Sequence, residues 1–138
     1  MDNEFFPCRA CVCWALRRAS RAISQHFEQS LRGTGLRITQ FSLLAMLAQT
    51  GPLPVSILAT KLGVERTTLT RNLRPLQARG LIRSISEEAD QRVHRVELTP
   101  AGRAAARKAL PAWKRAQSGA GPTLRRFKLD DLLKTERA

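Results

Sequence analysis

The amino-acid sequence predicts a mainly α-helical protein that carries one small β-hairpin. Over most of the 138 residues, apolar side chains recur at every third or fourth position, which is the period of an amphipathic helix. Between residues 81 and 98 this period gives way to two short stretches that alternate like strands on either side of a turn. The predicted order is four helices, the hairpin and two further helices.

A long first helix is expected over residues 12–31, because one apolar stripe runs along it and arginines lie on its other side. The glycines within 33–35 end this helix. A second helix is expected from Gln40 to about residue 49, with Thr39 as its N-cap and the Thr-Gly-Pro sequence after it as its stop.

Two shorter helices follow, and a glycine joins them. The first covers residues 55–62, and Gly63 closes it as a left-handed C-cap would. The second covers residues 65–79, where Pro75 removes one backbone hydrogen bond. We therefore expect a kink or a tight last turn at Pro75, and an end at Gly80.

The hairpin strands are predicted at 81–85 and 93–98. Thr99 followed by proline is then a strong start signal for a fifth helix that runs to about Gln117. A Gly- and Pro-containing break at 118–122 comes before a last short helix, which is marked by Leu129, Leu132 and Leu133.

The charge of the chain indicates a polyanionic partner. There are 24 Lys and Arg residues against 11 Asp and Glu residues, a formal net charge of +13, and only five of the cations are lysines. Arginine makes bidentate hydrogen bonds to phosphates and to guanine edges, which lysine does not. Net charge alone does not separate DNA from RNA, anionic lipid or acidic protein.

Several classes of protein are disfavoured. The acidic start of the chain and the arginines that interrupt its first apolar stretch are unlike a signal peptide or a membrane span. Three cysteines within six residues cannot form a disulfide framework, so a reduced, cytoplasmic setting is expected. Only His26 and His94 are available for acid–base chemistry and no catalytic motif is present, so we expect neither an enzyme nor a cofactor.

Two short helices followed by a hairpin form the pattern of a helix-turn-helix with a wing, whose second helix lies in the DNA major groove. In the second helix, leucines occupy one face and Arg and Thr occupy the other. Arg suits guanine or phosphate, and Thr suits phosphate or the thymine methyl group. The alternative is a solvated face of an ordinary all-α domain. The candidate DNA-contacting residues are Arg66, Thr67, Thr68, Thr70, Arg71 and Arg74.

Five stretches that lie between residues 58 and 102 carry a family resemblance. They are Leu58-Ala59 with Leu62-Gly63, Arg66 to Arg71, Leu76 to Ile82, Asp90-Gln91-Arg92, and Leu98-Thr99-Pro100-Ala101-Gly102. In this order and spacing they resemble the MarR family of winged-helix regulators, which implies a sequence-specific, duplex-DNA-binding regulator of transcription, most often a repressor.

The resemblance also implies a role for the wing. Arg92 would reach the minor groove or its phosphates, where the negative potential attracts arginine, and Asp90 would hold a basic side chain in position. Arg83 and Arg95, on the strands, would clamp the DNA backbone. The alternative for Asp90 and Arg92 is a surface ion pair that contributes about 0–1 kcal/mol.

The terminal helices suggest a homodimer, because their apolar residues exceed what one winged module can cover. The resemblance implies that these helices interlock and place two recognition helices about one DNA turn, ~34 Å, apart on a pseudo-palindromic site. We therefore divide the chain into dimerisation segments, 1–35 and 100–138, and a DNA-binding region, 36–99. Folding back within one chain is the alternative. The apolar residues are Phe5, Phe6, Trp14, Ile23, Phe27, Leu110, Trp113, Phe127 and Leu132.

The resemblance implies release from DNA by oxidation or by a small ligand. Cys8, Cys11 and Cys13 are candidate sensor thiols, because nearby arginines would favour the reactive thiolate. A disulfide between Cys11 and Cys13 would be strained, so a disulfide to the partner chain is favoured instead. The thiols could instead be small buried residues, or could together hold a soft metal ion.

A second hypothesis is an organic, anionic effector in a cleft between the dimerisation helices and the winged unit. Candidate lining residues are Trp14, Arg17, His26 and Phe41, although a lone histidine such as His26 is more often a hydrogen-bonded bystander. The alternative function for the whole chain is non-specific nucleic-acid packaging, which the net charge would permit.

Overall fold

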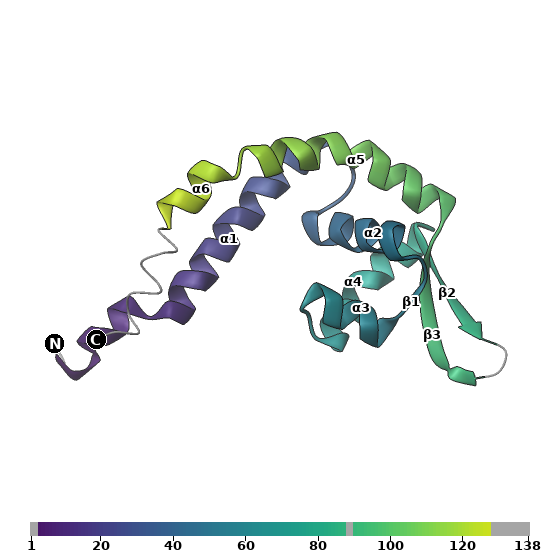
Figure 1. The fold of residues 1–138 in the computed structure, drawn as a ribbon, viewed down its shortest axis with the longest axis horizontal. Helices are drawn as coiled ribbons and strands as arrows, with labels where there is room; N and C mark the ends of the chain where they lie inside the picture. The colour runs from purple at the N-terminus through teal and green to yellow at the C-terminus, as the bar shows by residue number, and fades with distance from the viewer. Residues whose placement is uncertain (1–2, 88–89, 128–138) are drawn as a thin grey trace. The chain divides into compact units, whose positions relative to one another are not determined.

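The computed structural model describes residues 3–87 and 90–127, without the side chains of residue 87 and residues 90–93. It confirms a mainly helical fold with a small antiparallel sheet (Figure 1). In chain order the elements are η1 (Asn3–Ala10), α1 (Val12–Leu31), α2 (Ile38–Thr50), β1 (Leu53–Pro54), α3 (Val55–Leu62), α4 (Arg66–Ala78), β2 (Ile82–Glu87), β3 (Asp90–Leu98), α5 (Pro100–Ser118) and α6 (Gly121–Arg126).

The chain forms two compact units. Met1–Ser30 and Trp113–Ala138 form one, and Leu31–Ala112 form the other, which we call the winged unit. The winged unit holds the three short helices, the sheet and the first part of α5. It begins and ends outside residues 36–99, because Leu31 and the alanines at 106, 109 and 112 are buried. The assignment of the terminal helices to dimerisation stays a prediction.

A leucine core holds the winged unit together. Leu44 and Leu47 of α2, Leu58 of α3, and Leu69 and Leu76 of α4 each expose 1% or less of their surface. Burial of each such side chain stabilises the fold by about 1.5–3 kcal/mol. The apolar stripes predicted for these three helices are therefore the faces that meet in the core.

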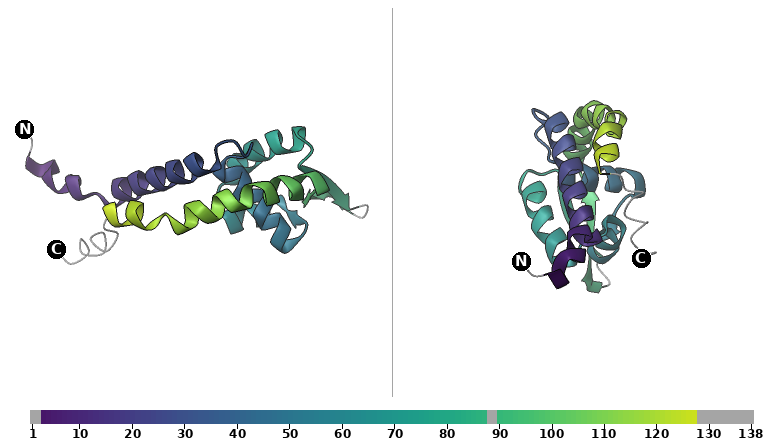
Figure 2. Two further views of the ribbon diagram at one scale, coloured as in Figure 1. Left: turned by 90° about the horizontal axis from the view of Figure 1, so that it is seen from above. Right: turned by 90° about the vertical axis from the view of Figure 1, so that its left-hand side faces the viewer.

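The hairpin belongs to a three-stranded sheet in the order β1-β3-β2, with both pairings antiparallel. β1 is a difference from the sequence prediction, which treated the segment before residue 55 as a stop. With two residues it is too short for an alternation pattern, and Pro54 is tolerated because β1 is an edge strand. The described parts of β2 and β3 extend past α3 and α4 as a ribbon (Figures 1 and 2).

Two helix starts differ from the prediction. The second helix begins at Ile38 with Arg37 as its N-cap, so the assignment of Thr39 as cap was wrong. The reason is a side-chain cap from within the helix, since the Arg37 N–H donates to Oε1 of Gln40 at 3.0 Å. α6 begins at Gly121, inside the predicted break, with Pro122 in its first turn, where a missing N–H costs nothing.

The two helices predicted on either side of Gly63 are present, with ends that differ by no more than one residue from the prediction. The helix 55–62 ends at Gly63, whose φ of +67° is left-handed. α4 continues through Pro75 to Ala78, and Gly80 follows with a φ of +70°. The last helix, predicted at Leu129, Leu132 and Leu133, lies outside the described residues. No helix in the described ranges has the length and hydropathy of a membrane span.

In the unit formed by the two ends of the chain, α1 lies alongside the last part of α5 and α6 (Figure 2). Nε2 of His26 donates to the Ala116 carbonyl at 2.8 Å. This is the hydrogen-bonded role that the sequence analysis gave as the more common one for a lone histidine. Large apolar side chains remain exposed at the start of the chain, with 60% of Phe5, 62% of Phe6 and 65% of Trp14 accessible. These values agree with the surplus of apolar residues noted in the sequence.

Candidate nucleic-acid interface

The turn between α3 and α4 sets the direction of α4. After Gly63 takes its left-handed conformation, the Val64 N–H donates to the Ala59 carbonyl at 3.1 Å and closes α3. Glu65 is then extended, and α4 begins at Arg66. The turn that ends α3 is therefore closed by backbone hydrogen bonds around one glycine.

α4 presents one face to the core and the other to solvent. Leu69, Leu73 and Leu76 are buried, as predicted. On the opposite side, five side chains line a concave surface of about 380 Å³, which we call the α4 surface: Arg66, Thr67, Thr70, Arg71 and Arg74. Thr68 is exposed on the same helix but does not line it. The structure thus brings together five of the six α4 residues proposed from the sequence.

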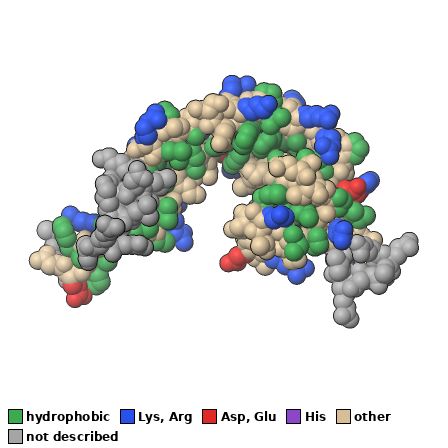
Figure 3. Space-filling model, viewed as in Figure 1, with side chains coloured by type: hydrophobic (Ala, Val, Ile, Leu, Met, Phe, Trp, Pro, Cys, Tyr) green, Lys and Arg blue, Asp and Glu red, His purple; other side chains and the backbone are tan. Residues whose placement is uncertain are grey.

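The chemistry of the α4 surface is cationic and rich in donors. Three guanidinium groups surround it, and no carboxylate lines it. The Thr70 hydroxyl donates to the Arg66 carbonyl at 2.9 Å, which leaves its oxygen lone pairs available as acceptors. On the face that Figure 3 shows, Lys and Arg side chains are spread over the described residues and Asp and Glu side chains are few.

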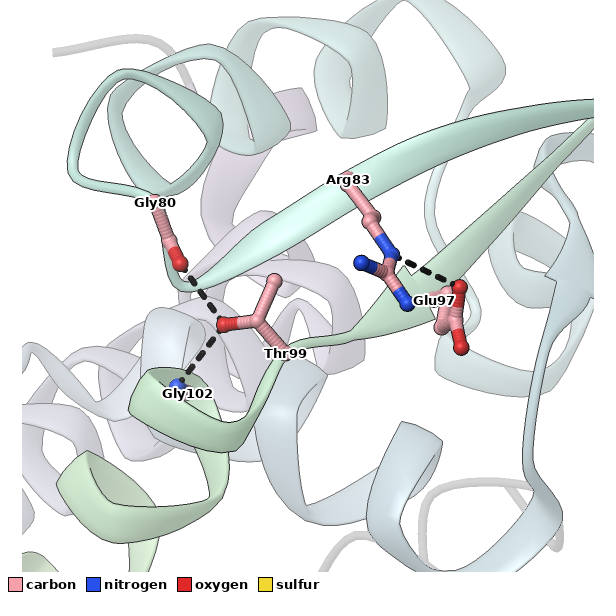
Figure 4. Close-up of polar contacts among 5 residues, drawn as sticks. All are labelled: Gly80, Arg83, Glu97, Thr99 and Gly102. Carbon is pink, nitrogen blue, oxygen red and sulfur yellow. Dashed lines mark hydrogen bonds and ion pairs between the residues drawn. The ribbon is translucent and has the colours of Figure 1, made fainter.

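At the base of the wing, Arg83 and Glu97 form an ion pair that the sequence analysis missed. They are directly opposite each other on β2 and β3, and Nε of Arg83 donates to Oε2 of Glu97 at 2.9 Å (Figure 4). The cross-strand register would have revealed it, because opposite charges face one another. A phosphate contact by Arg83 stays a prediction, and such a contact would have to compete with this carboxylate.

The pair predicts a pH dependence of stability. The hydrogen bond from Arg83 lowers the pKa of Glu97, and the same bond raises the pKa of Arg83. The folded-state pKa of Glu97 therefore lies below its unfolded value, which is about 4.3. The stabilisation by the pair is fully present above the unfolded pKa, and it is lost as the pH falls through the folded-state pKa.

The Glu97→Gln variant tests this dependence. We expect a small deficit in melting temperature that is constant at neutral pH and shrinks below a pH of about 4.3. Thermal melts of both proteins across that range measure it. A deficit that grows as the pH falls would have the wrong sign.

The remaining wing residues are placed only in part. Arg95 of β3 is half-buried and pairs with Ile85 on one side and Pro54 on the other. The backbone of Asp90 and Arg92 belongs to β3, but their side chains lie outside the described residues. Their contact with the minor groove stays a prediction.

A polar junction joins α4, the wing and α5. The Thr99 hydroxyl donates to the Gly80 carbonyl at 2.6 Å and accepts the Gly102 N–H at 3.0 Å (Figure 4). Thr99 is therefore the N-cap that its position before Pro100 predicts. Gly102 is buried, and a Cβ atom there would clash with the Leu81 carbonyl oxygen. These contacts explain why threonine and glycine occur at positions 99 and 102 of the Leu98–Gly102 stretch: both are needed where the backbone of α4, the wing and α5 meets.

The three cysteines are free thiols. Cys8 and Cys13 are exposed and Cys11 is half-buried, which disfavours the view of all three as buried apolar residues. Among the described residues, no three His, Cys, Asp or Glu side chains are grouped closely enough to hold a metal ion. The alternative in which all three cysteines bind one metal is therefore not supported.

The candidate effector residues fall in both units. Trp14, Arg17 and His26 belong to α1, whereas Phe41 is buried in the winged unit. Phe41 lines a groove of about 230 Å³ between α2 and α5, which we call the α2–α5 groove. Sequence spacing did not reveal this groove, because its walls are about 60 residues apart. The other lining residues are Ala45, Ala48, Gln49, Arg103, Ala106, Arg107 and Leu110.

Comparison with known proteins agrees with this geometry. The MarR family model matches residues 36–94. The transcriptional regulator MosR of M. tuberculosis, solved in complex with DNA, is 41% identical with a TM-score of 0.72, over 91% of this chain and 96% of that one. A MarR-family regulator from Silicibacter pomeroyi is 32% identical with a TM-score of 0.62, over 87% of this chain and 84% of that one.

A third relative is BpsR of Bordetella bronchiseptica, whose DNA binding is regulated by 6-hydroxynicotinic acid. It is 27% identical with a TM-score of 0.70, over 89% of this chain and 96% of that one. The search of curated proteins gave no match. With the family model lying over the winged unit and a 41% identical regulator spanning nearly the whole chain, this protein belongs to the MarR family of DNA-binding transcriptional regulators.

Proposed function

We propose that this protein regulates transcription by binding specific sequences of duplex DNA as a homodimer, with α4 in the major groove. The observation that carries the proposal is the α4 surface, where three arginines and two threonines line one concavity directly opposite the buried leucines. Arg pairs with guanine O6 and N7 or with phosphate, and Thr contacts phosphate or the thymine methyl group. The DNA complex of the 41% identical regulator supports this proposal.

The ribbon of β2 and β3 supports a second contact. A wing that extends past α3 and α4 is suited to reach the neighbouring minor groove, where Arg92 would enter with Asp90 holding it. Arg83 and Arg95 would then lie behind the tip, along the backbone. This part of the proposal concerns affinity more than sequence preference, because phosphate contacts carry no base information.

The homodimer would present two such surfaces to one duplex. Exposed aromatic side chains at Phe5, Phe6 and Trp14 are the kind of surface that an isologous interface covers. Two α4 helices related by a two-fold axis would read a pseudo-palindrome whose half-sites are about 10 bp apart, centre to centre.

Selection from a library of random duplexes tests the function. The protein should enrich an inverted repeat with that spacing, and fluorescence anisotropy should show at least ~10³-fold tighter binding to the enriched duplex than to a shuffled duplex. A non-specific packaging protein would enrich nothing and bind both duplexes equally. That result would overturn the proposal.

We propose the exposed thiols as one release signal. A thiolate attacks peroxide to give a sulfenic acid and hydroxide, and a second thiol condenses with the sulfenic acid to form a disulfide and water. The arginines near Cys8, Cys11 and Cys13 in the sequence and the exposure of two of these thiols support this reaction.

Peroxide should therefore release wild-type protein from the enriched duplex, with an apparent Kd raised by about 10-fold or more, because a disulfide shifts the equilibrium towards a non-binding arrangement. A variant with all three cysteines changed to serine should stay bound, and reductant should restore wild-type binding. Equal release of both proteins would exclude the thiols.

We propose the α2–α5 groove as the site of the alternative signal, a small organic anion. Its apolar floor is edged by Arg103 and Arg107, and its volume of about 230 Å³ suits a molecule with one ring. The regulation of BpsR by 6-hydroxynicotinic acid supports this class of effector.

A titration with 6-hydroxynicotinate, with the thiols kept reduced, tests this site. It should weaken binding of the wild-type protein to the enriched duplex by about 5–150-fold, the usual range of allosteric coupling. The Arg107→Ala variant should keep its preference for the enriched duplex and lose the response to the ligand, whereas Lys108→Ala, which removes a neighbouring exposed cation, should keep both. A response that survives in Arg107→Ala would exclude the groove.

A further inference from the structure

We infer that Glu65 determines part of the DNA sequence specificity: its carboxylate accepts a hydrogen bond from the exocyclic amino group of one cytosine in each half-site. This inference deepens the proposed function and rests on it. It is carried by the position of Glu65 at the N-terminal end of α4, where its exposed carboxylate has no hydrogen-bond or ion-pair partner among the described residues.

The backbone holds Glu65 in a defined place. Before it, the Val64 N–H donates to the Ala59 carbonyl at 3.1 Å, which closes α3. After it, the Leu69 N–H donates to the Glu65 carbonyl at 2.9 Å in the first turn of α4. Glu65 itself is extended, with φ of −69° and ψ of 149°. Its Cα atom is therefore held from both sides, and the side chain is the part that is free to reach a ligand.

Helix capping does not explain a glutamate at this position. The residues that cap well are Ser, Thr, Asp and Asn, whose side chains accept a backbone N–H of the first turn. The Glu65 side chain makes no such hydrogen bond. An ion pair along the helix would need a cation three or four residues later, and these positions are Thr68 and Leu69. For α4 alone, the carboxylate adds only a weak interaction with the positive end of the helix.

The charge of Glu65 also differs from that of its surroundings. In the winged unit, Glu65 and Glu97 are the two acidic residues whose side chains the structure describes, and Glu97 is paired with Arg83. Glu65 directly precedes Arg66, which lines the α4 surface. An unpaired carboxylate beside this surface is repelled by phosphates, so its presence favours binding only where the DNA offers it a hydrogen-bond donor.

The major groove offers few donors. An ionised carboxylate can only accept hydrogen bonds. Guanine and thymine present acceptors along this edge, and adenine presents its N6 amino group beside the acceptor N7. Cytosine presents its N4 amino group without a neighbouring acceptor of its own. Because the N-terminal residues of a recognition helix are those that contact base edges, the position of Glu65 favours cytosine as its partner.

Selection from the library of random duplexes, made with the wild-type protein and with Glu65→Gln, tests the inference. The wild-type protein should enrich a cytosine at one fixed position of each half-site. Replacing that C·G pair in one half-site should weaken its binding by about 5–150-fold. Glutamine both donates and accepts, and so pairs with N6 and N7 of adenine. The Glu65→Gln protein should therefore enrich adenine at this position and the wild-type bases at all others.

Two further variants separate base contact from helix stability and from overall charge. Glu65→Ser introduces a preferred N-cap residue, so it should melt no lower than the wild-type protein. It should nevertheless lose the preference for cytosine, because a hydroxyl group both donates and accepts. Glu97→Gln removes a negative charge elsewhere in the winged unit and should leave every base preference unchanged, since its partner Arg83 is proposed to contact only the DNA backbone.

The outcomes distinguish this inference from the proposed function. If the wild-type protein and both Glu65 variants enriched the same bases at every position, Glu65 would not contact a base, and the inference would be wrong while the proposed function stood. A wild-type preference for a base other than cytosine at the position that Glu65→Gln changes would also overturn it. If the wild-type protein enriched no sequence, the proposed function would fail, and the inference with it.

Discussion

Replacing Gly102 by alanine is expected to destabilise the protein by about 3 kcal/mol, although alanine is the better helix former by about 1 kcal/mol. The added Cβ atom would clash with the Leu81 carbonyl oxygen and would lie 2.7 Å from Cδ1 of Leu98. The carbonyl cannot move freely, because it accepts the Thr99 N–H at 3.1 Å. Either the junction or the first turn of α5 must therefore distort.

Thermal unfolding followed by circular dichroism measures this effect, and a fall in melting temperature of roughly 10 °C is expected for a chain of this size. Ala104→Gly is the matched control, since it makes the reverse change at an exposed position of the same helix and should cost only about 1 kcal/mol. A Gly102→Ala protein that melts at or above the wild-type temperature would show that α5 does not pack against Leu81 in this way.

Replacing Arg71 by alanine is expected to remove much of the discrimination between the enriched and the shuffled duplex. Arg71 lines the α4 surface, and a bidentate contact to guanine is worth about 1–3 kcal/mol, or about 10–100-fold in affinity, at each half-site. Binding to the shuffled duplex should fall much less, because it loses only an electrostatic contact. Anisotropy titrations of both duplexes measure the two effects separately.

The control is Lys108→Ala, which removes one positive charge from an exposed position on α5. It should weaken binding to both duplexes equally and slightly, as a change in overall charge does. If Arg71→Ala behaved like Lys108→Ala, with the sequence preference intact, then Arg71 would not read bases.

The parts of the fold that sequence alone could predict are those set by local chemistry. The end of α3 at Gly63, the end of α4 before Gly80 and the cap at Thr99 each depend on one residue type beside an apolar period. The α4 surface follows for the same reason, because the buried leucines of one helix determine which arginines and threonines share its other side.

The parts that could not be predicted depend on contacts between distant segments. The Arg37 cap of α2 arises from Gln40 reaching back, where Thr39 offered a more familiar cap. The Arg83–Glu97 pair requires the strand register, and the bond from Arg79 to Gly35 spans 44 residues. No pattern within a single helix carries such information.

Methylation interference on the enriched duplex tests the central claim most directly, because dimethyl sulfate marks guanine N7 in the major groove and adenine N3 in the minor groove. With α4 seated in the major groove, N7 marks should block binding in two patches about one helical turn apart, and Arg71→Ala should lose that sensitivity. Binding that tolerates every major-groove mark and responds only to those in the minor groove would contradict this placement of α4.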